Sequence, residues 1–285
     1  MAACAVDTAI RSNIASGGKL SHMAILDNFC WCSSNEPTRL AELVDAVRAC
    51  YEYAVGYGTP FISGKDSMFN DFKGYDENGK LVAISIPPTL LISSISVISD
   101  IQKTVSPEFK SVGDAVYIIG ETHDELGASE YFKLLAKNST AIGNSAPKVD
   151  WKKNKKTYQA LENAIAKELV ASSISLTSGG LVVALAKTSV GGALGAKISL
   201  QGLPGSATSI DAALFSESQG RILVTVAKKN ISAFEKCMKG IAFAKIGTVS
   251  SDKKLTIKGA KGGIVVDAPL AKLSTSYHSF SNKNS

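Results

Sequence analysis

Hydrophobic residues along this chain recur with two different periods, one typical of helices and one typical of strands. In residues 5–15 and 40–54 apolar side chains return every three or four positions, which predicts amphipathic helices. A proline near the start and glycines near the end of the second segment support its helical limits. Its apolar positions form one stripe, which in a globular protein faces the core: Leu40, Leu43, Val44, Val47, Tyr51 and Ala54.

The rest of the chain alternates between short apolar runs and further helical patterns. The apolar runs predict strands at 22–26, 81–86, 89–98, 115–119, 174–177, 196–200, 221–227, 244–249 and 255–257. Additional helices are predicted at 129–137, 158–170, 181–189 and 231–239. Because strands alternate with helices but also follow one another locally, we predict an α+β fold in which helices cover mixed sheets.

Polar segments divide this pattern into two predicted domains. The first spans residues 1–105, a linker covers 106–112, the second domain covers 113–273, and 274–285 is a frayed tail. Residues 138–149 are expected to be a flexible connection. The chain opens on a helix with no strands before it, so we interpret the first domain as truncated at its N-terminal side.

The composition narrows the class of protein. Of the 285 residues 45% are hydrophobic and 20% charged, an ordinary globular profile with a net charge of +6. The lysines are scattered and lack interleaved aromatic residues, which argues against nucleic-acid binding. The longest apolar run, 90–98, is too short to cross a membrane. Five cysteines without a secretory signal indicate reduced thiols in the cytoplasm, and their spacing does not favour zinc.

One stretch, residues 59–71, combines residue types that suit a phosphate group. A short apolar entry predicts a buried strand, and Gly64 then lets the backbone approach a ligand. Lys65 supplies a compact positive charge, while Asp66 and Ser67 could share a hydrated metal ion. The P-loop pattern is excluded because Asp66 follows the lysine and Thr59 stands in place of the first glycine. The alternative is an exposed polar turn between strands.

Four stretches together resemble one enzyme family. They are Ile25–Trp31, Gly58–Met68, Gly120–Glu130 and Leu214–Arg221. In this order they are similar to phosphoribosylformylglycinamidine synthase, specifically the C-terminal half of its synthetase subunit, within the aminoimidazole ribonucleotide synthetase-like superfamily. The similarity runs from about Ala2 to Asp267. It implies a two-domain unit whose preceding segment and companion first half are absent.

The resemblance implies an ATP-dependent C–N ligase of purine biosynthesis. The family converts formylglycinamide ribonucleotide and glutamine-derived ammonia to an amidine, with ATP and Mg²⁺ as cofactors. The implied partners are the missing first half, a glutaminase and the ribonucleotide. The implied nucleotide-binding residues are Gly64, Lys65, Asp66, Ser67, Asp27, Asn28, Thr177, Glu217, Ser218 and Arg221. For Arg221 a surface ion pair with Glu217 is an equal alternative.

Two departures from the family pattern concern the metal. Where the family has Glu and Asn on its first helix this chain has Thr8 and Ser12, and before the glycine pair at 179–180 the family aspartate is replaced by Ser175. A nucleotide-bound magnesium ion needs one or two carboxylates, so we expect no metal site here and no ATP hydrolysis by the chain alone. The alternatives are a degenerate nucleotide-binding or structural half, or a related aminoimidazole ribonucleotide synthetase-type enzyme. Exposed sheet surface also makes a homodimer an open alternative.

Overall fold

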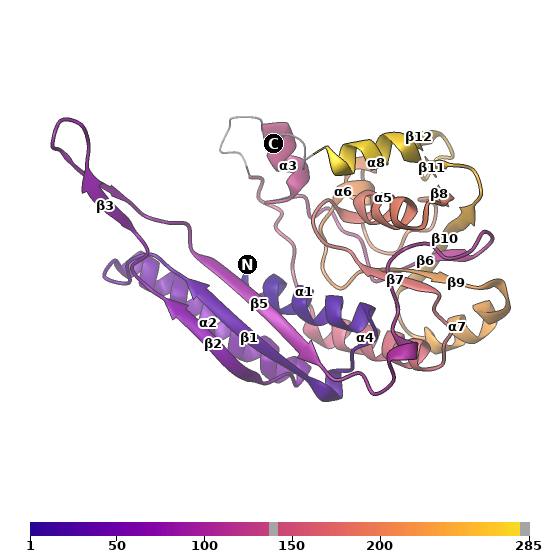
Figure 1. Cartoon of the computed structure of the whole chain (residues 1–285), viewed down its shortest axis with the longest axis horizontal. Helices are drawn as coiled ribbons and strands as arrows, with labels where there is room; N and C mark the ends of the chain where they lie inside the picture. Colours follow the sequence, from indigo (N-terminus) through magenta and orange to yellow (C-terminus); the bar gives the residue numbers. More distant parts are fainter. Residues whose placement is uncertain (137–141, 280–285) are drawn as a thin grey trace.

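The computed structural model describes residues 1–136 and 142–279 and shows two lobes (Figure 1). A small lobe is built on a three-stranded sheet and a large lobe on a seven-stranded sheet, and both sheets are mixed. Helices pack on both faces of the large sheet and on one face of the small sheet, so the predicted α+β class is confirmed. The domain limits at 105 and 113 stay a prediction.

The small lobe has β1 (Met23–Cys30) as its central strand. Strand β2 (Phe61–Ser67) runs parallel to it on one side, and β5 (Thr89–Ser96) runs antiparallel on the other. Helices α1 (Ala2–Ala15) and α2 (Pro37–Tyr57) pack together over one face. The opposite face is uncovered within the described chain: the β5 side chains of Leu91 and Ile95 on it are 61% and 57% exposed.

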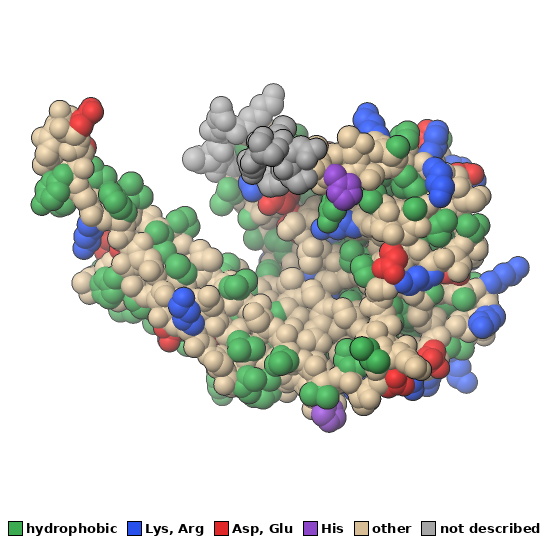
Figure 2. Space-filling model, viewed as in Figure 1, with side chains coloured by type: hydrophobic (Ala, Val, Ile, Leu, Met, Phe, Trp, Pro, Cys, Tyr) green, Lys and Arg blue, Asp and Glu red, His purple; other side chains and the backbone are tan. Residues whose placement is uncertain are grey.

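A separate hairpin projects from the small lobe into solvent (Figure 1). It consists of β3 (Phe72–Tyr75) and β4 (Leu81–Ile84), which pair only with each other among the described strands. The predicted strand at 81–86 therefore belongs to this hairpin, and the prolines that follow lead from it into β5. The space-filling view shows hydrophobic side chains along the hairpin (Figure 2).

Helix α2 buries a different side from the one predicted. Its buried side consists of small residues, Ala46, Cys50 and Ala54, which let the helix lie close to its neighbours. Of the predicted stripe, Ala54 is buried and Leu43 packs partly against the core. The other four are exposed because the apolar arc of α2 is wider than the surface it packs on: Leu40, Val44, Val47 and Tyr51.

The large lobe contains seven strands in the order β12-β11-β8-β10-β6-β9-β7. They are β6 (Ala115–Ile119), β7 (Ser172–Ser175), β8 (Gly195–Ser199), β9 (Ile222–Val226), β10 (Phe243–Ser250), β11 (Lys254–Lys258) and β12 (Ile264–Pro269). Its helices are α3 (Glu130–Ala136), α4 (Trp151–Ala166), α5 (Gly180–Gly192), α6 (Ile210–Phe215), α7 (Ile231–Cys237) and α8 (Leu270–His278).

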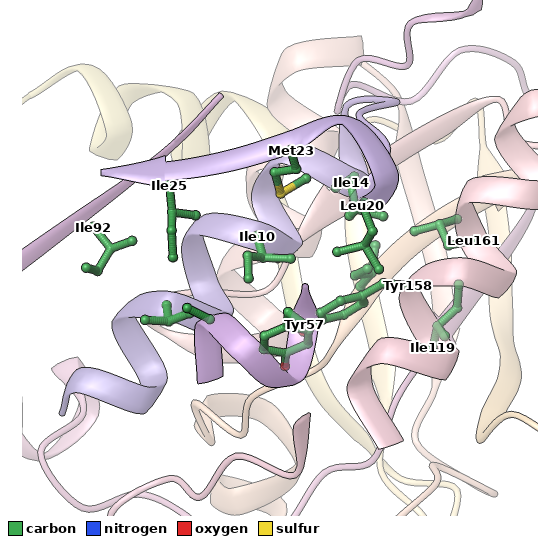
Figure 3. Packing of buried hydrophobic residues seen from close by; sticks show 14 of the residues in the cluster. Ile10, Ile14, Leu20, Met23, Ile25, Tyr57, Ile92, Ile119, Tyr158 and Leu161 are labelled. Atoms are coloured by element: carbon green, nitrogen blue, oxygen red, sulfur yellow. The ribbon is translucent and has the colours of Figure 1, made fainter. Parts of the chain in front are cut away.

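Strand β6, which lies between β10 and β9, contributes to two hydrophobic cores because its side chains alternate between the faces of the sheet. Val116 and Ile118 pack with α5 and α6 in one core. Tyr117 and Ile119 belong to the other core, which also contains α1, α2, α4, α7 and residues of β1. Figure 3 shows Ile119 and Leu161 of the large lobe in the same cluster as residues of the small lobe. The two lobes therefore share one continuous hydrophobic core.

Several predicted limits need correction. Helix α4 begins at Trp151 rather than near 158, because the Asp150 carboxylate accepts a hydrogen bond from the Lys153 amide and caps the helix earlier. The predicted tail from 274 is wrong for its first part, since α8 continues through His278. Helix α6 was not predicted. Residues 137–141 of the predicted helix end and connection, and 280–285 of the tail, lie outside the described residues.

A close helix contact gives a stability prediction. A Cβ placed on Gly56 would lie 2.6 Å from the Trp151 ring, so α2 and α4 approach over a bare glycine. We expect Gly56→Ala to lower the free energy of unfolding by about 1–3 kcal/mol through overpacking, although alanine is the better helix former. Urea denaturation measures this. The control is Gly263→Ala, where a Cβ meets open space; an equal effect of the two substitutions would contradict the prediction.

Candidate functional site

The GKDS segment lies within strand β2, so the predicted phosphate loop is wrong as local structure. The strand continues through Ser67 and is largely exposed, not buried. In the parallel register Asp27 lies beside Gly64 and Asn28 beside Lys65. A Cβ at Gly64 would lie 2.1 Å from Asp27 Oδ1, so the glycine makes room for this carboxylate. Burial raises the pKa of Asp27, and the neighbouring Asp66 carboxylate raises it further.

Lys65 stands on the uncovered face of the small sheet. Paired residues on neighbouring strands point to the same face and successive residues alternate, so Lys65 and Asn28 share the face opposite α1 and α2. Lys65 is exposed, and within the described chain no hydrogen bond or ion pair engages its ammonium group. Helix α1 contacts the large lobe from the other side of this sheet. The structure therefore does not bring Lys65 together with the predicted residues of the large lobe.

In the large lobe Glu217 and Ser218 hold loop backbones. Glu217 Oε1 accepts hydrogen bonds from the amides of Gly179 (2.8 Å) and Glu130 (3.0 Å), at the start of α5 and α3. Ser218 Oγ accepts one from the His123 amide at 3.1 Å. Thr177 is half-buried in the turn before α5, where its carbonyl accepts a hydrogen bond from Gly180 N. These interactions fix the turns around the N-terminus of α5.

Arg221 is fully buried, which excludes the alternative of a surface ion pair with Glu217. Its guanidinium donates to the carbonyls of Ser218 (3.0 Å) and Ser216 and to Thr122 Oγ1 (3.0 Å). Burial lowers the pKa of Arg221 to about 9, and the charge of Arg11 adds to this effect. The side chain therefore organises the 216–221 loop from inside.

The two lobes meet at a buried ionic cluster on α1 that sequence reasoning did not identify as a site. Asp7 and Arg11 form an ion pair with both side chains fully buried. Asp7 Oδ1 also accepts hydrogen bonds from Tyr158 OH (2.6 Å), Asn154 Nδ2 (2.9 Å) and Tyr57 OH. Burial and the Asp7 charge hold the pKa of both tyrosines well above its usual range, so the phenols remain donors.

All five N–H donors of Arg11 have an acceptor. Nε donates to Ser175 Oγ (2.9 Å), and the two terminal nitrogens donate to Asp7, to Leu176 O (2.8 Å) and to Gln219 Oε1 (3.0 Å). The fifth donor reaches Thr8 Oγ1 at 3.3 Å. Thr8 and Ser175, two of the positions where the family motif is altered, thus meet at this guanidinium. Ser12 is exposed and lies outside the cluster.

This cluster does not fit a magnesium–nucleotide complex. Its carboxylate, Asp7, is already paired with Arg11 and hydrogen-bonded by three side chains. The hydroxyls of Thr8 and Ser175 are also engaged with Arg11. Magnesium binds carboxylate and phosphate oxygens. In this cluster the side-chain oxygens of Asp7, Thr8 and Ser175 already accept hydrogen bonds from the Arg11 guanidinium. Among the described residues no group of three or more His, Cys, Asp or Glu side chains could hold a metal ion.

A polar cleft of about 340 Å³ adjoins the cluster, with Asn154 and Gln219 contributing to both. Lys153 forms an ion pair with Glu121 at its wall. Glu125 Oε1 accepts a hydrogen bond from the Lys148 amide at 2.9 Å, while Glu125 Oε2 is buried and receives no hydrogen bond from residues 1–136 or 142–279. A free buried acceptor favours a ligand that carries an N–H or O–H donor.

The signal for the ionic cluster was present in the sequence. Asp7 and Arg11 are four residues apart, a spacing that places opposite charges side by side on a helix, and both lie among the apolar positions of α1. The partners could not be found in the same way. Tyr57, Asn154, Ser175 and Gln219 come from distant segments that meet only in the folded chain.

These features define an α+β unit with a charged, buried junction between two lobes, and its larger lobe matches a known family. The family model "AIR synthase related protein, C-terminal domain" matches residues 111–260. The chain belongs to this family.

Solved structures share the fold over nearly the whole chain. PurL of Thermotoga maritima in complex with FGAR aligns with 96% of this chain at 19% identity and a TM-score of 0.73, covering 42% of the PurL chain. PurLQS from the same organism aligns at 18% identity with a TM-score of 0.68. The HypE–HypF complex aligns at 19% identity with a TM-score of 0.66 and 84% coverage of that chain. The present chain thus spans about two fifths of the PurL chains.

None of the described helices is both long enough and apolar enough to cross a bilayer.

The ionic cluster gives a second stability prediction. We expect Arg11→Met to lower the free energy of unfolding by about 3–5 kcal/mol, because it leaves the buried Asp7 charge uncompensated. Denaturant unfolding followed by circular dichroism measures the loss. Arg39→Met is the control, since Arg39 pairs with Glu42 at the surface and such pairs contribute at most about 1 kcal/mol. Similar losses in the two variants would contradict a structural role for the cluster.

Asp27 gives a pH-dependent prediction. Its pKa is raised in the folded chain, so the folded state holds this proton more tightly than the unfolded state and loses stability as the pH rises through the raised pKa. Asp27→Asn should therefore increase the free energy of unfolding at pH 7, with a difference that vanishes below about pH 4. Urea titrations at both pH values test this, with Glu77→Gln in the exposed hairpin turn as the control. A variant less stable than wild type at pH 7 would refute it.

Proposed function

We propose that this chain is the C-terminal half of a PurL-type synthetase, an ATP-dependent C–N ligase that forms an amidine from formylglycinamide ribonucleotide and glutamine-derived ammonia. The observation that carries the proposal is that the sequence motifs and the structural alignment point to the same protein and together extend over most of the chain. The four motifs of the resemblance extend from Ile25 to Arg221, and the fold aligns over 96% of the chain with FGAR-bound PurL. The implied partners are a first half, which supplies the rest of the synthetase, and a glutaminase; PurLQS is a related assembly.

On this proposal the chain does not hydrolyse ATP by itself. Phosphoryl transfer depends on charge neutralisation around the transferred group, and a bound metal contributes several kcal/mol of it. The ionic cluster on α1 offers no free carboxylate, because Asp7 is paired with Arg11. Lys65 alone supports at most phosphate binding, since a charge-assisted hydrogen bond contributes about 1.5–3 kcal/mol.

The location of Lys65 supports a role that requires the first half. With Asn28 it lies on the sheet face left uncovered in this chain. A partner that packs against this face would enclose Lys65, Asn28 and Ser67, which share it. The nucleotide, ATP or ADP, would then contact these residues in the assembled enzyme. The polar cleft, where no described residue donates a hydrogen bond to Glu125 Oε2, is a second place where an amide- or hydroxyl-bearing ribonucleotide would bind.

One observation favours the alternative function, in which this chain completes the fold of the synthetase but takes no part in catalysis. The ionic cluster satisfies every donor of Arg11 from within the chain, as expected of a part that only completes a fold. Reconstitution separates the two functions.

The test mixes the purified chain with a separately produced first half of a PurL-type synthetase and a glutaminase. We expect amidine formation only when all three are present, and no magnesium-dependent ATP hydrolysis by this chain alone. Lys65→Ala should reduce the reconstituted rate at least ~10-fold through the lost charge-assisted contact, whereas Lys80→Ala in the hairpin turn should not. Amidine formation that does not rise above the first half alone would favour the structural alternative. Robust ATP hydrolysis by the isolated chain, lost in Lys65→Ala, would refute the inactive site.

A further inference from the structure

Helix α2 carries a row of large apolar side chains in contact with solvent. This row, called here the α2 seam, is formed by Leu40 (44% exposed), Val44 (38%), Val47 (49%), Tyr51 (73%) and Val55 (64%). The intervals between them are four, three, four and four residues, which keeps all five on one side of the helix. Single exposed apolar residues are common, but a continuous row indicates an interaction surface.

The α2 seam takes no part in the hydrophobic core. The α2 residues that belong to the buried core are Ala46, Cys50, Ala54 and Tyr57, and Leu43, Ala49 and Tyr53 pack partly against it. The seam lies beside this buried side and extends over about 22 Å of helix, at 1.5 Å per residue. No charged residue interrupts it. Its length and apolar character match the seam of a helix pair, in which such positions repeat at intervals of three and four.

The charges beside the seam indicate which partner fits. Arg48 and Glu52 are four residues apart on one flank, so they lie on the same side of the helix. Arg48 contacts Asp45 at 3.5 Å with both side chains about three quarters exposed, a weak surface pair. Glu52 is exposed, and within the described chain nothing pairs with its carboxylate.

If a two-fold axis passes between Arg48 and Glu52, this flank of α2 meets the same flank of a second copy, and the opposite charges of the two residues pair. In an antiparallel pair of α2 helices each Arg48 would face the partner's Glu52, and Tyr51 and Val47 would lie near the centre of the contact. Isologous interfaces have this property, since one patch meets its own copy. The exposed strands of the β3–β4 hairpin are another largely apolar surface, but their one charged residue is Lys73, so they offer no opposite charges that a two-fold axis could pair.

We infer that the α2 seam is the interface for a second copy of this chain, which binds through antiparallel pairing of two α2 helices. The dimer would bury the seam of both copies and form two Arg48–Glu52 ion pairs. This surface is distinct from the uncovered face of the small sheet, which lies opposite α2, so the dimer leaves that face available. The inference does not depend on the proposed function.

Sedimentation of the full chain over a wide concentration range tests the inference. The wild type should reach a monomer–dimer equilibrium, and Val47→Glu with Tyr51→Glu should weaken it on the order of 100-fold or more by placing charges at the centre. Both positions are exposed in the monomer, and an unchanged circular dichroism spectrum shows that the fold is intact. Ile101→Glu is the control, an 81% exposed apolar residue elsewhere. A wild type that stays monomeric at its highest soluble concentration overturns the inference.

A charge exchange tests the two-fold geometry. Arg48→Glu and Glu52→Arg should each weaken the dimer roughly tenfold, because each puts like charges together in both symmetric pairs. The double variant restores opposite charges and should recover most of the wild-type affinity. A double variant weaker than both single variants would overturn the antiparallel arrangement. A dimer disrupted by Leu91→Glu on the uncovered sheet face, but not by the seam variants, would show that another surface mediates association and would also overturn the inference.

Discussion

The structure depends on a buried guanidinium that has to satisfy five hydrogen-bond donors. Arg11 finds its acceptors on α1, at the end of β7 and in the 216–221 loop. Because an unpaired buried charge is strongly destabilising, these three segments can occupy only a narrow range of relative positions. Asp7 extends the constraint to α2 and α4 through Tyr57, Tyr158 and Asn154. One ion pair therefore fixes the junction on which both lobes are arranged.

This constraint also changes what the junction can do chemically. Thr8 and Ser175 stand at positions where the resemblance implies carboxylates, and their hydroxyls accept hydrogen bonds from Arg11. The junction is thereby neutral and internally satisfied rather than rich in free oxygens. The remaining polar features lie elsewhere, at Lys65 on the uncovered sheet face and at Glu125 in the polar cleft.

Sequence patterns predicted the elements whose burial is uniform. Strands β6 and β9 are buried along their whole length, and both were placed to within a residue. The sequence patterns gave wrong predictions for segments that are buried on one side only, because the neighbouring elements decide which side is covered. The GKDS segment reads as a loop because it is polar, yet as an edge strand it needs only its backbone to pair with β1. The stripe of α2 was assigned to the core because periodicity cannot tell which part of a wide apolar arc is covered.

The candidate site shows the same limit. The motif marked the positions of Glu217, Ser218 and Arg221. Several of their hydrogen bonds are with residues distant in sequence, such as Gly179, His123 and Thr122, which the sequence alone does not bring together. Lys65 is separated from these residues because side chains alternate between the two faces of the sheet along β2. Its face could be assigned only once the register between β2 and β1 was known.

The hydrophobic core shared by the two lobes has a consequence for how the molecule can be divided. Tyr117, Ile119 and Val224 of the seven-stranded sheet belong to the same hydrophobic cluster as residues of α1, α2 and β1, and α1 contacts strand β7 of that sheet. A fragment that begins at residue 113 would leave part of this cluster in water, at about 25 cal/mol for each Å² exposed. We therefore expect the two lobes to unfold together, and the larger lobe produced without the smaller one to be less stable.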